Sequence, residues 1–279
     1  MSRTPGIDVS RWQREIDWQQ VAAAGHAFVV IRATIGNYYT DPRFYVNWRD
    51  ARDAGLLVSA YHVVVPDRPA DSQIERFFDV LDDRWCDIPP VLDVELTRGA
   101  SREGITSCVE GCAAAMERAG GRKPVIYTAR WFWDRYVLDA PVSSQCDLWV
   151  AHYGVSSPWL PRGWDEWRFW QYSDHGQVPG IRAATDLNWF NGTHDDLLVY
   201  VDAEPVEIEP PAAGLRARVT VETLGVRNGP GLNYDHIENL YEDDVVNVVS
   251  LAGRHVWIQI APEKWVPFRS RDRQYLELE

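Results

Sequence analysis

The feature that most constrains the fold is a regular alternation of short apolar runs with helical patterns. The apolar runs are rich in β-branched residues and have the length of strands; they cover residues 6–10, 27–34, 56–64, 89–96 and 123–129. Helical patterns lie between several of them, at residues 41–55, 71–84 and 105–121. Alternation of this kind is typical of parallel strands joined by crossover helices.

Further strand-like runs follow with less helix between them, at residues 147–153, 167–173 and 184–190. The whole pattern predicts an α/β fold: an irregular, TIM-like β/α barrel with about five β/α units plus three further strands. Such barrels carry their chemistry at the C-terminal ends of the strands. The polar residues that we expect there are Asp8, Arg32, His62, Glu95, Tyr127, Tyr153, Gln171 and Asp186.

A change of composition near residue 203 indicates a domain boundary. Residues 203–214, "AEPVEIEPPAAG", combine proline, acidic and small residues, as linkers do. Short alternating strands separated by Gly, Pro and Asn turns follow, which is typical of a small all-β barrel. We therefore expect a barrel domain at residues 1–202, a linker at 203–214 and a small β domain at 215–279.

Two carboxylates interrupt the apolar run "PPVLDVEL" at residues 89–96. On a strand, residues two apart face the same way, about 7 Å apart at their Cα atoms, so Asp93 and Glu95 share one face. Two neighbouring carboxylates in a partly dry site raise the pKa of one of them. A carboxylic acid that stays protonated near neutral pH is what cleavage of a glycosidic bond requires.

A structural role and a metal-binding role are the alternatives for this pair. An Asp–Glu pair at a strand end can simply be satisfied by arginine or by backbone donors. Two more strand-end acids, Asp8 and Asp186, favour a chemical role over packing. Four carboxylates at the mouth of a barrel, without basic residues to balance them, are hard to explain by packing. Four acids could also hold a divalent cation, but an Asp-rich loop and a helical His pair are absent from the sequence. We predict neither a metal nor a cofactor.

Composition excludes some partners. The net charge is −13 and the chain has only two lysines, which argues against binding to nucleic acid. The N-terminal residues lack the apolar core of about 7–15 residues that a secretory signal has, and no stretch has the length of a membrane span.

The four scattered cysteines are expected to be buried and reduced. Fourteen Trp and twelve Tyr fit either core packing or sugar stacking.

Seven motifs, in this order, resemble glycoside hydrolase family 25, the Chalaropsis-type lysozymes: "GIDVSRWQREIDW", "DPRFYVNWRDARDAGLLVSAYHV", "PPVLDVE", "PVIYTARWFW", "LWVAHY", "WRFWQYS" and "TDLNWF". The resemblance covers roughly residues 5–191. It implies a modified β/α barrel that hydrolyses the β-1,4 bond between N-acetylmuramic acid and N-acetylglucosamine in peptidoglycan.

The resemblance also implies roles for single residues. Glu95 matches the proton donor, and Asp93 matches its partner, which could stabilise positive charge or orient the N-acetyl group of the substrate. Asp8 and Asp186 match the other two acids of the family's site. The residues expected to contact substrate are Tyr61, Tyr127, Gln171, Tyr153 and Trp170. The two tyrosines at 61 and 127 could instead fill the barrel, His62 could be structural, and Trp12, Trp131 and Trp170 could be either stacking or core residues.

The departures from the family pattern leave the four acids untouched. Arg14 stands where the family commonly has Gly, which puts the backbone conformation of the first turn in question. Ile35 replaces a position that is often polar, and Ser59 one that is often Gly.

The segment 215–270 resembles bacterial SH3-like domains through "GVRNGPGLNYDHIENL" and "WIQI…KWVPF". This second resemblance implies binding to the cell wall, and a module that only packs is the alternative. We expect a monomeric peptidoglycan hydrolase, made as a phage endolysin in the host cytoplasm and acting on the wall after release. The alternatives are an exported, extracellular bacterial autolysin and a wall-binding protein without turnover. A chitinase-like barrel fits less well, because Val91 stands where that pattern has another acid.

Overall fold

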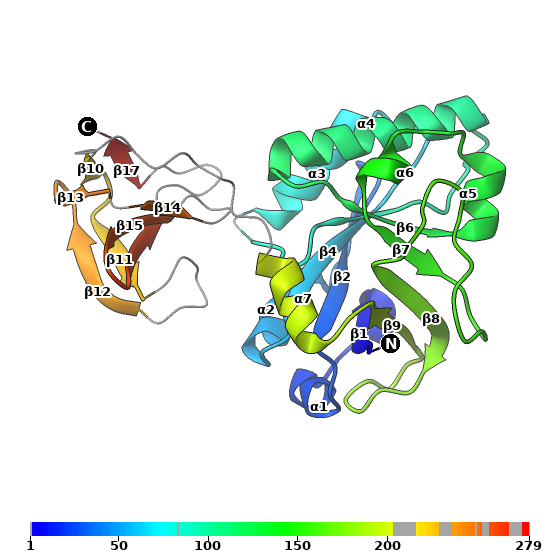
Figure 1. Cartoon of the computed structure of the whole chain (residues 1–279), viewed down its shortest axis with the longest axis horizontal. Helices are drawn as coiled ribbons and strands as arrows, with labels where there is room; N and C mark the ends of the chain where they lie inside the picture. Colours follow the sequence, from blue (N-terminus) through cyan, green and yellow to red (C-terminus); the bar gives the residue numbers. More distant parts are fainter. Residues whose placement is uncertain are drawn as a thin grey trace. The chain divides into compact units, whose positions relative to one another are not determined.

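The structure is a computed structural model that describes residues 2–82, 84–202, 216–228, 236–248, 250–252, 257–267 and 275–278. The chain divides into two compact units, Met1–Val201 and Asp202–Glu279 (Figure 1). The predicted linker, residues 203–214, lies outside the described residues.

The described part of the first unit is built on a closed barrel. Its strands are β1 (Thr4–Val9), β2 (Phe28–Ile35), β4 (Leu57–Val63), β5 (Val91–Asp93), β6 (Val125–Ala129), β7 (Leu148–Ala151), β8 (Phe169–Gly176) and β9 (Thr185–Phe190). They pair in the order β1-β2-β4-β5-β6-β7-β8-β9, and β9 returns to β1. The short strand β3 (Tyr39–Thr40) forms a hairpin with the end of β2. The predicted irregular β/α barrel is therefore confirmed.

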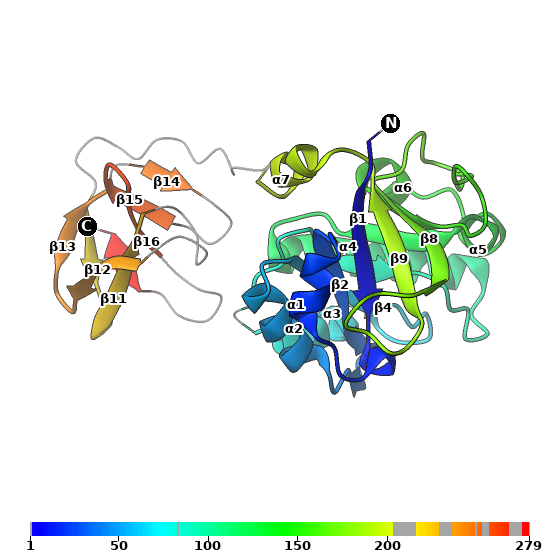
Figure 2. The same ribbon diagram turned by 90° about the horizontal axis from the view of Figure 1, so that it is seen from below.

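One strand runs against the others. The pairs from β1 through β8 are parallel, whereas β9 is antiparallel to both β8 and β1. A loop of residues 177–184, and not a crossover helix, connects β8 to β9. Figure 2 shows β1, β9 and β8 side by side with no helix drawn in front of them. Aromatic side chains shield this side of the barrel instead, including Tyr172 and Trp189, which stack with centroids 4.9 Å apart.

Helices cover the remaining sides. They are α1 (Trp18–Ala23), α2 (Phe44–Asp53), α3 (Ala70–Leu81), α4 (Arg102–Gly120), α5 (Arg130–Tyr136), α6 (Val142–Gln145) and α7 (His194–Asp202). The 3-10 turn η1 (Arg11–Gln13) follows β1. Figure 1 shows α3 and α4 side by side. The apolar stripe that predicts α3 is the face that it buries, through Ile74, Phe77, Phe78 and Leu81.

The barrel interior is packed at one end. Phe28, Val125 and Phe169 point inward and form one apolar cluster with further inward side chains. Gly6 makes room for this packing, because a Cβ atom on it would lie 2.4 Å from the ring of Phe28. The opposite end, where β1 to β8 finish, is left for polar side chains.

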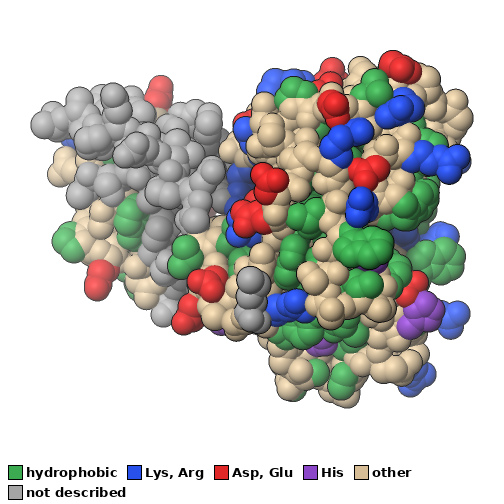
Figure 3. Space-filling model, turned by 45° about the vertical axis from the view of Figure 1, so that its right-hand side comes forward, with side chains coloured by type: hydrophobic (Ala, Val, Ile, Leu, Met, Phe, Trp, Pro, Cys, Tyr) green, Lys and Arg blue, Asp and Glu red, His purple; other side chains and the backbone are tan. Residues whose placement is uncertain are grey.

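The cysteine side chains of the first unit agree with the prediction from the sequence. Cys86, Cys108, Cys112 and Cys146 are all buried and free, as predicted. Within the described residues, no helix has the length and apolar character needed to cross a membrane. On the face of the first unit in Figure 3, acidic and basic side chains are interspersed.

The described part of the second unit is all β, as predicted. Its strands are β10 (Arg216–Val219), β11 (Thr223–Arg227), β12 (His236–Tyr241), β13 (Val245–Asn247), β14 (Ser250–Ala252), β15 (Trp257–Ala261), β16 (Lys264–Pro267) and β17 (Leu276–Leu278). They form two antiparallel sheets, β13-β10-β17 and β12-β11-β16-β15-β14. Val219, Val226, Ile258 and Val266 belong to its core. The SH3-like assignment stays a prediction, and part of the sequence that suggested it lies outside the described residues.

Candidate active site

A cavity of about 180 Å³ opens at the end of the barrel where β1 to β8 finish. Its walls are side chains of inward-facing strand positions and of the residues that follow them. The lining residues are Asp8, Tyr61, Val91, Asp93, Glu95, Tyr127, Trp149, Tyr153, Gln171 and Asp186. All four acids that the sequence singled out therefore meet in one place, together with four of the five residues expected to contact substrate.

Asp8 and Asp186 form a pair across two strands. They are register partners in the antiparallel pairing of β1 with β9, and a hydrogen bond joins their carboxyl groups. Asp8 is 6% exposed, and its Oδ2 accepts hydrogen bonds from Gln171 Nε2 at 2.9 Å and Asn188 Nδ2 at 2.8 Å. Those donors favour an ionised Asp8. The shared proton therefore lies on Asp186.

The pKa of Asp186 follows from this arrangement. Burial is the largest cause of its increase, followed by the negative charge of Asp8 and the hydrogen bond to it, and the pKa reaches about 8. Burial also raises the pKa of Asp8, while the hydrogen bonds from Asn188 and Gln171 oppose that increase. One proton is thus held between two carboxyl groups at neutral pH.

Asp93 and Glu95 line the cavity from the end of β5. Burial raises the pKa of Asp93 well above its usual value, and the charges of Glu95 and Asp8 add to the increase. Glu95 is exposed at the mouth, yet protein surrounds its carboxyl group closely enough that burial, followed by the charge of Asp8, raises its pKa. Burial contributes more to these increases in pKa than the like charges that we expected to dominate.

Two hydrogen-bonded chains hold Asp8 in place. The hydroxyl groups of Tyr127 and Tyr153 donate to Gln171 Oε1, at 2.8 and 2.6 Å, and the amide of Gln171 donates to Asp8. On the other side, Trp149 Nε1 donates to Asn188 Oδ1 at 2.9 Å, and Asn188 donates to Asp8.

Trp149 and Asn188 were not predicted from the sequence as site residues. A usable signal existed in each case. Trp149 precedes Tyr153 by four residues, and Asn188 follows Asp186 by two. Residues an even number of positions apart on a strand face the same side, so Trp149 shares a face with Tyr153 and Asn188 shares one with Asp186.

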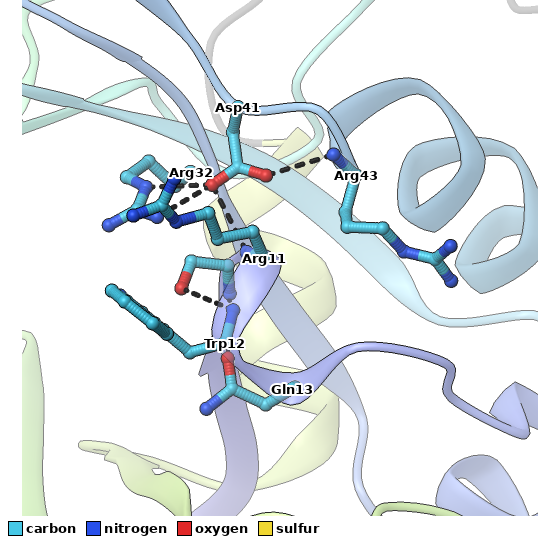
Figure 4. A network of polar contacts seen from close by, with 7 residues as sticks. Arg11, Trp12, Gln13, Arg32, Asp41 and Arg43 are labelled. Carbon is cyan, nitrogen blue, oxygen red and sulfur yellow. Dashed lines mark hydrogen bonds and ion pairs between the residues drawn. The ribbon is translucent and has the colours of Figure 1, made fainter.

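The nearby arginine does not neutralise the cavity. Arg32 lowers the pKa of Asp93 and of Tyr61, but these are minor contributions beside the burial that raises both pKa values. Its guanidinium group makes an ion pair with Asp41, with Nη2 and Oδ2 2.8 Å apart. Asp41 is 1% exposed and also accepts hydrogen bonds from the backbone N–H groups of Arg11 and Arg43 (Figure 4). The charge of Arg32 is therefore offset by a buried carboxylate outside the cavity.

Comparison with known proteins decides the family. The profile of "Glycosyl hydrolases family 25" matches residues 7–181, which is more than half of the chain and includes three of the four cavity acids. The chain belongs to glycosyl hydrolase family 25. It is a glycoside hydrolase.

Individual relatives agree with the family assignment. The "Lysozyme M1" of Streptomyces globisporus is 35% identical over 208 residues, which cover 71% of either chain. The "Autolytic lysozyme" of Clostridium acetobutylicum is 32% identical over 238 residues, 84% of this chain and 68% of its own. A crystal structure of a bacterial lysozyme from Streptomyces coelicolor superposes with a TM-score of 0.65 at 34% identity, over 72% of this chain and 98% of the other.

Two residues considered from the sequence lie away from the cavity of this family 25 barrel. Trp170 is 2% exposed, packs against Leu148 and Val150, and donates its Nε1–H to the carbonyl of His152. The prediction that Trp170 contacts substrate needs correction, because Gln171 points into the barrel and its strand neighbour must point outward.

His62 likewise faces the helices. It is fully buried, with Nδ1 2.7 Å from Thr34 Oγ1, and burial lowers its pKa to about 4. It is therefore a structural histidine.

Two tryptophans at the cavity end are exposed to solvent, one in η1 and one in the first turn of α5. Trp12 follows β1 and is 63% exposed, and Trp131 follows β6 and is 67% exposed. Neither is a core residue. Among the described residues, no group of three or more His, Cys, Asp or Glu side chains is arranged to hold a metal ion.

Proposed function

We propose that the chain is an N-acetylmuramidase that hydrolyses the β-1,4 bond between N-acetylmuramic acid and N-acetylglucosamine in peptidoglycan. The observation that carries the proposal is the cavity itself: four carboxyl groups with raised pKa values at the end of a family 25 barrel. The lysozyme relatives support the choice of substrate.

Glu95 is the proposed proton donor. It lies at the mouth, where a glycosidic oxygen can reach it, and the increase in its pKa favours the protonated form that a proton donor needs. The proton of Glu95 passes to the leaving oxygen as the glycosidic bond breaks. Water then supplies the new hydroxyl group on the anomeric carbon, and the proton that this water loses passes to a carboxylate of the cavity. The ionised Asp8 stabilises the positive charge that develops on the sugar ring.

Asp93 is the proposed partner of the substrate's acetamido group. Its Oδ1 is buried and has no hydrogen-bond partner among the residues that the structure describes. A buried acceptor without a donor is costly, so a bound ligand that supplies one is favoured. The N–H of an N-acetyl group is such a donor, which supports the orienting role over simple charge stabilisation.

The test is hydrolysis of purified bacterial walls, followed by loss of turbidity and by release of reducing ends. Glu95→Gln removes the transferable proton and is expected to lower kcat about 10²- to 10⁴-fold. Glu103→Gln is the matched control, because Glu103 is an exposed glutamate in the first turn of α4. Walls that stay intact across species and pH, or full activity of Glu95→Gln, would contradict the proposal. Wall binding without product release would favour the non-catalytic alternative.

We further propose that the second unit binds the wall and that the chain acts as a phage endolysin, made in the host cytoplasm and released at lysis. A small β unit joined to the barrel supports wall targeting. The autolytic relative from Clostridium supports the alternative, a bacterial autolysin that acts outside the cell. A gene for a small membrane pore beside this gene is expected for an endolysin; a bacterial chromosomal locus without phage genes would favour the autolysin.

A further inference from the structure

Three exposed arginines lie at the cavity end of the barrel, one in η1 and two on loops. Arg11 follows β1, Arg68 follows β4 and Arg98 follows β5, and all three side chains are exposed. They gather around the turn between β2 and β3, where Tyr38 and Tyr39 lie. We name Arg11, Arg68 and Arg98 the arginine rim.

Aromatic rings hold the arginine rim in place. The guanidinium carbon of Arg68 is 5.7 Å from the centroid of Tyr38, and Arg98 Nη2 donates to the hydroxyl of Tyr38 at 3.4 Å. The guanidinium carbon of Arg11 is 4.5 Å from Trp12 and 5.6 Å from Tyr39. Stacking on rings orders a guanidinium group and leaves its hydrogen-bond donors free for a ligand.

The positive charges of the arginine rim are not offset by ion pairs within the described part of the chain. In the described residues, no ion pair involves Arg11, Arg68 or Arg98, although the chain has a net charge of −13. Another exposed arginine at this end of the barrel does have an acidic partner. Arg130, which follows β6, makes an ion pair with Asp134 at 3.2 Å. Uncompensated positive charge is therefore concentrated on the side of β1, β4 and β5.

We propose that the arginine rim binds the carboxylates of the stem peptide that each muramyl residue carries. This inference rests on the proposed function, since it concerns the same substrate. The stem peptide leaves the sugar through its lactyl group and carries free carboxylates. The ionised Asp8 in the cavity repels those carboxylates, while three guanidinium groups that make no ion pair among the described residues attract them. The neutral sugars thus enter the cavity and the anionic peptide lies over the rim.

The experiment compares binding of two soluble probes to the full chain, with Glu95→Gln present throughout to prevent turnover. One probe is a glycan fragment with tetrapeptide stems; the other is the same fragment after an amidase has removed the peptides. Charge reversal at Arg68→Glu with Arg98→Glu is expected to weaken binding of the peptide-bearing probe about tenfold and to leave the bare glycan unchanged. The difference should shrink as salt is raised.

Arg135→Glu is the matched control, because Arg135 is also exposed and lies over a tyrosine ring, Tyr136, at 5.2 Å, but at the last turn of α5. It should change neither affinity. Circular dichroism and melting temperature establish folding, and Arg68→Gln with Arg98→Gln provides a milder pair. An equal loss of affinity for both probes, or no loss of affinity for the peptide-bearing probe, would overturn the proposal that the arginine rim binds the stem peptide. Failure of the proposed function is a separate result: the parent chain would release no reducing ends from either substrate.

Discussion

At the scale of single residues, hydrogen bonding to Asp8 sets the proton balance of the cavity. Asn188 and Gln171 donate to one oxygen of Asp8, which favours its ionised form and leaves the shared proton on Asp186. Neither amide carries a charge, yet together they determine which of two neighbouring acids is protonated. The chemistry of the site therefore depends on residues that do not themselves transfer a proton.

Asn188→Leu tests that dependence. The substitution keeps a similar volume but removes the donor to Asp8 and the acceptor for Trp149 Nε1. A hydrogen bond to a charged group contributes about 1.5–3 kcal/mol, so kcat/KM should fall roughly 10- to 100-fold. The acidic limb of the pH profile of kcat/KM should also move to higher pH, since loss of the donor makes Asp8 easier to protonate. Asn191→Leu is the control, because that amide donates to Trp167 outside the cavity; equal effects of the two variants would argue against the relay.

The raised pKa of Asp186 predicts how stability varies with pH. The folded chain holds this proton up to a pKa of about 8, whereas the ordinary value is 3.8, so folding binds a proton between those pH values. The stabilisation is complete below about pH 4 and is lost as pH rises toward 8, by at most about 1.4 kcal/mol per pH unit.

Urea unfolding at pH 5 and pH 7 measures this slope. The free energy of unfolding of the parent should be lower at pH 7 than at pH 5. Asp186→Asn cannot ionise and should show a smaller decrease. A parent chain that is more stable at pH 7 would show that other titrating groups outweigh Asp186.

At the scale of elements, the turn after β1 is held by a capping box and strained at one residue. In η1, Ser10 Oγ accepts from the backbone of Trp12, and Gln13 Oε1 accepts from the backbone of Ser10. The turn ends at Arg14 with φ 58° and ψ −123°, a conformation that favours glycine. The structure thus answers the question that the sequence raised: the family's usual Gly is absent, and Arg14 adopts the backbone of a glycine.

Arg14→Gly should therefore stabilise the chain. Relief of backbone strain exceeds the extra flexibility of Gly in the unfolded chain, and we expect a net gain of about 1 kcal/mol. Arg14→Ala is the matched control, since it removes the same long side chain but keeps a Cβ atom, and it should give no such gain. Thermal melts of the three proteins give the comparison. A gain with Ala equal to that with Gly would assign the effect to the side chain and not to strain.

At the scale of the whole molecule, all the cavity residues belong to one unit. The ten lining residues lie within Met1–Val201, and the second unit has its own sheets and core. Hydrolysis and the proposed attachment to the wall would thus belong to separate parts of the chain. A tethered wall-binding unit acts by raising the local concentration of the barrel on its polymer.

A chain ending at residue 202 separates these two contributions. Its kcat/KM on soluble muropeptide should equal that of the full chain, because the cavity is complete. Its rate on whole walls at low enzyme concentration should fall about tenfold or more. Sedimentation with walls should show the same difference in binding. Undiminished activity on walls would mean that the second unit does not target the enzyme.

Much of this molecule follows from local sequence. Strand and helix periodicity predicts the barrel, and the spacing of Asp93 and Glu95 places both on one face, because alternation along a strand depends only on sequence neighbours. The same alternation could have excluded Trp170, whose neighbour Gln171 points inward.

Tertiary structure decided what depends on residues far apart in the chain. Because β9 is antiparallel to β1, its first residues lie beside the last residues of β1, which places Asp186 opposite Asp8. The link from Trp149 through Asn188 to Asp8, the pairing of Arg32 with Asp41, and the burial that dominates the pKa values depend on register and closure of the barrel. Sequence spacing fixes which side of a strand a residue faces, but only the closed sheet fixes which residues then meet and how much water remains between them.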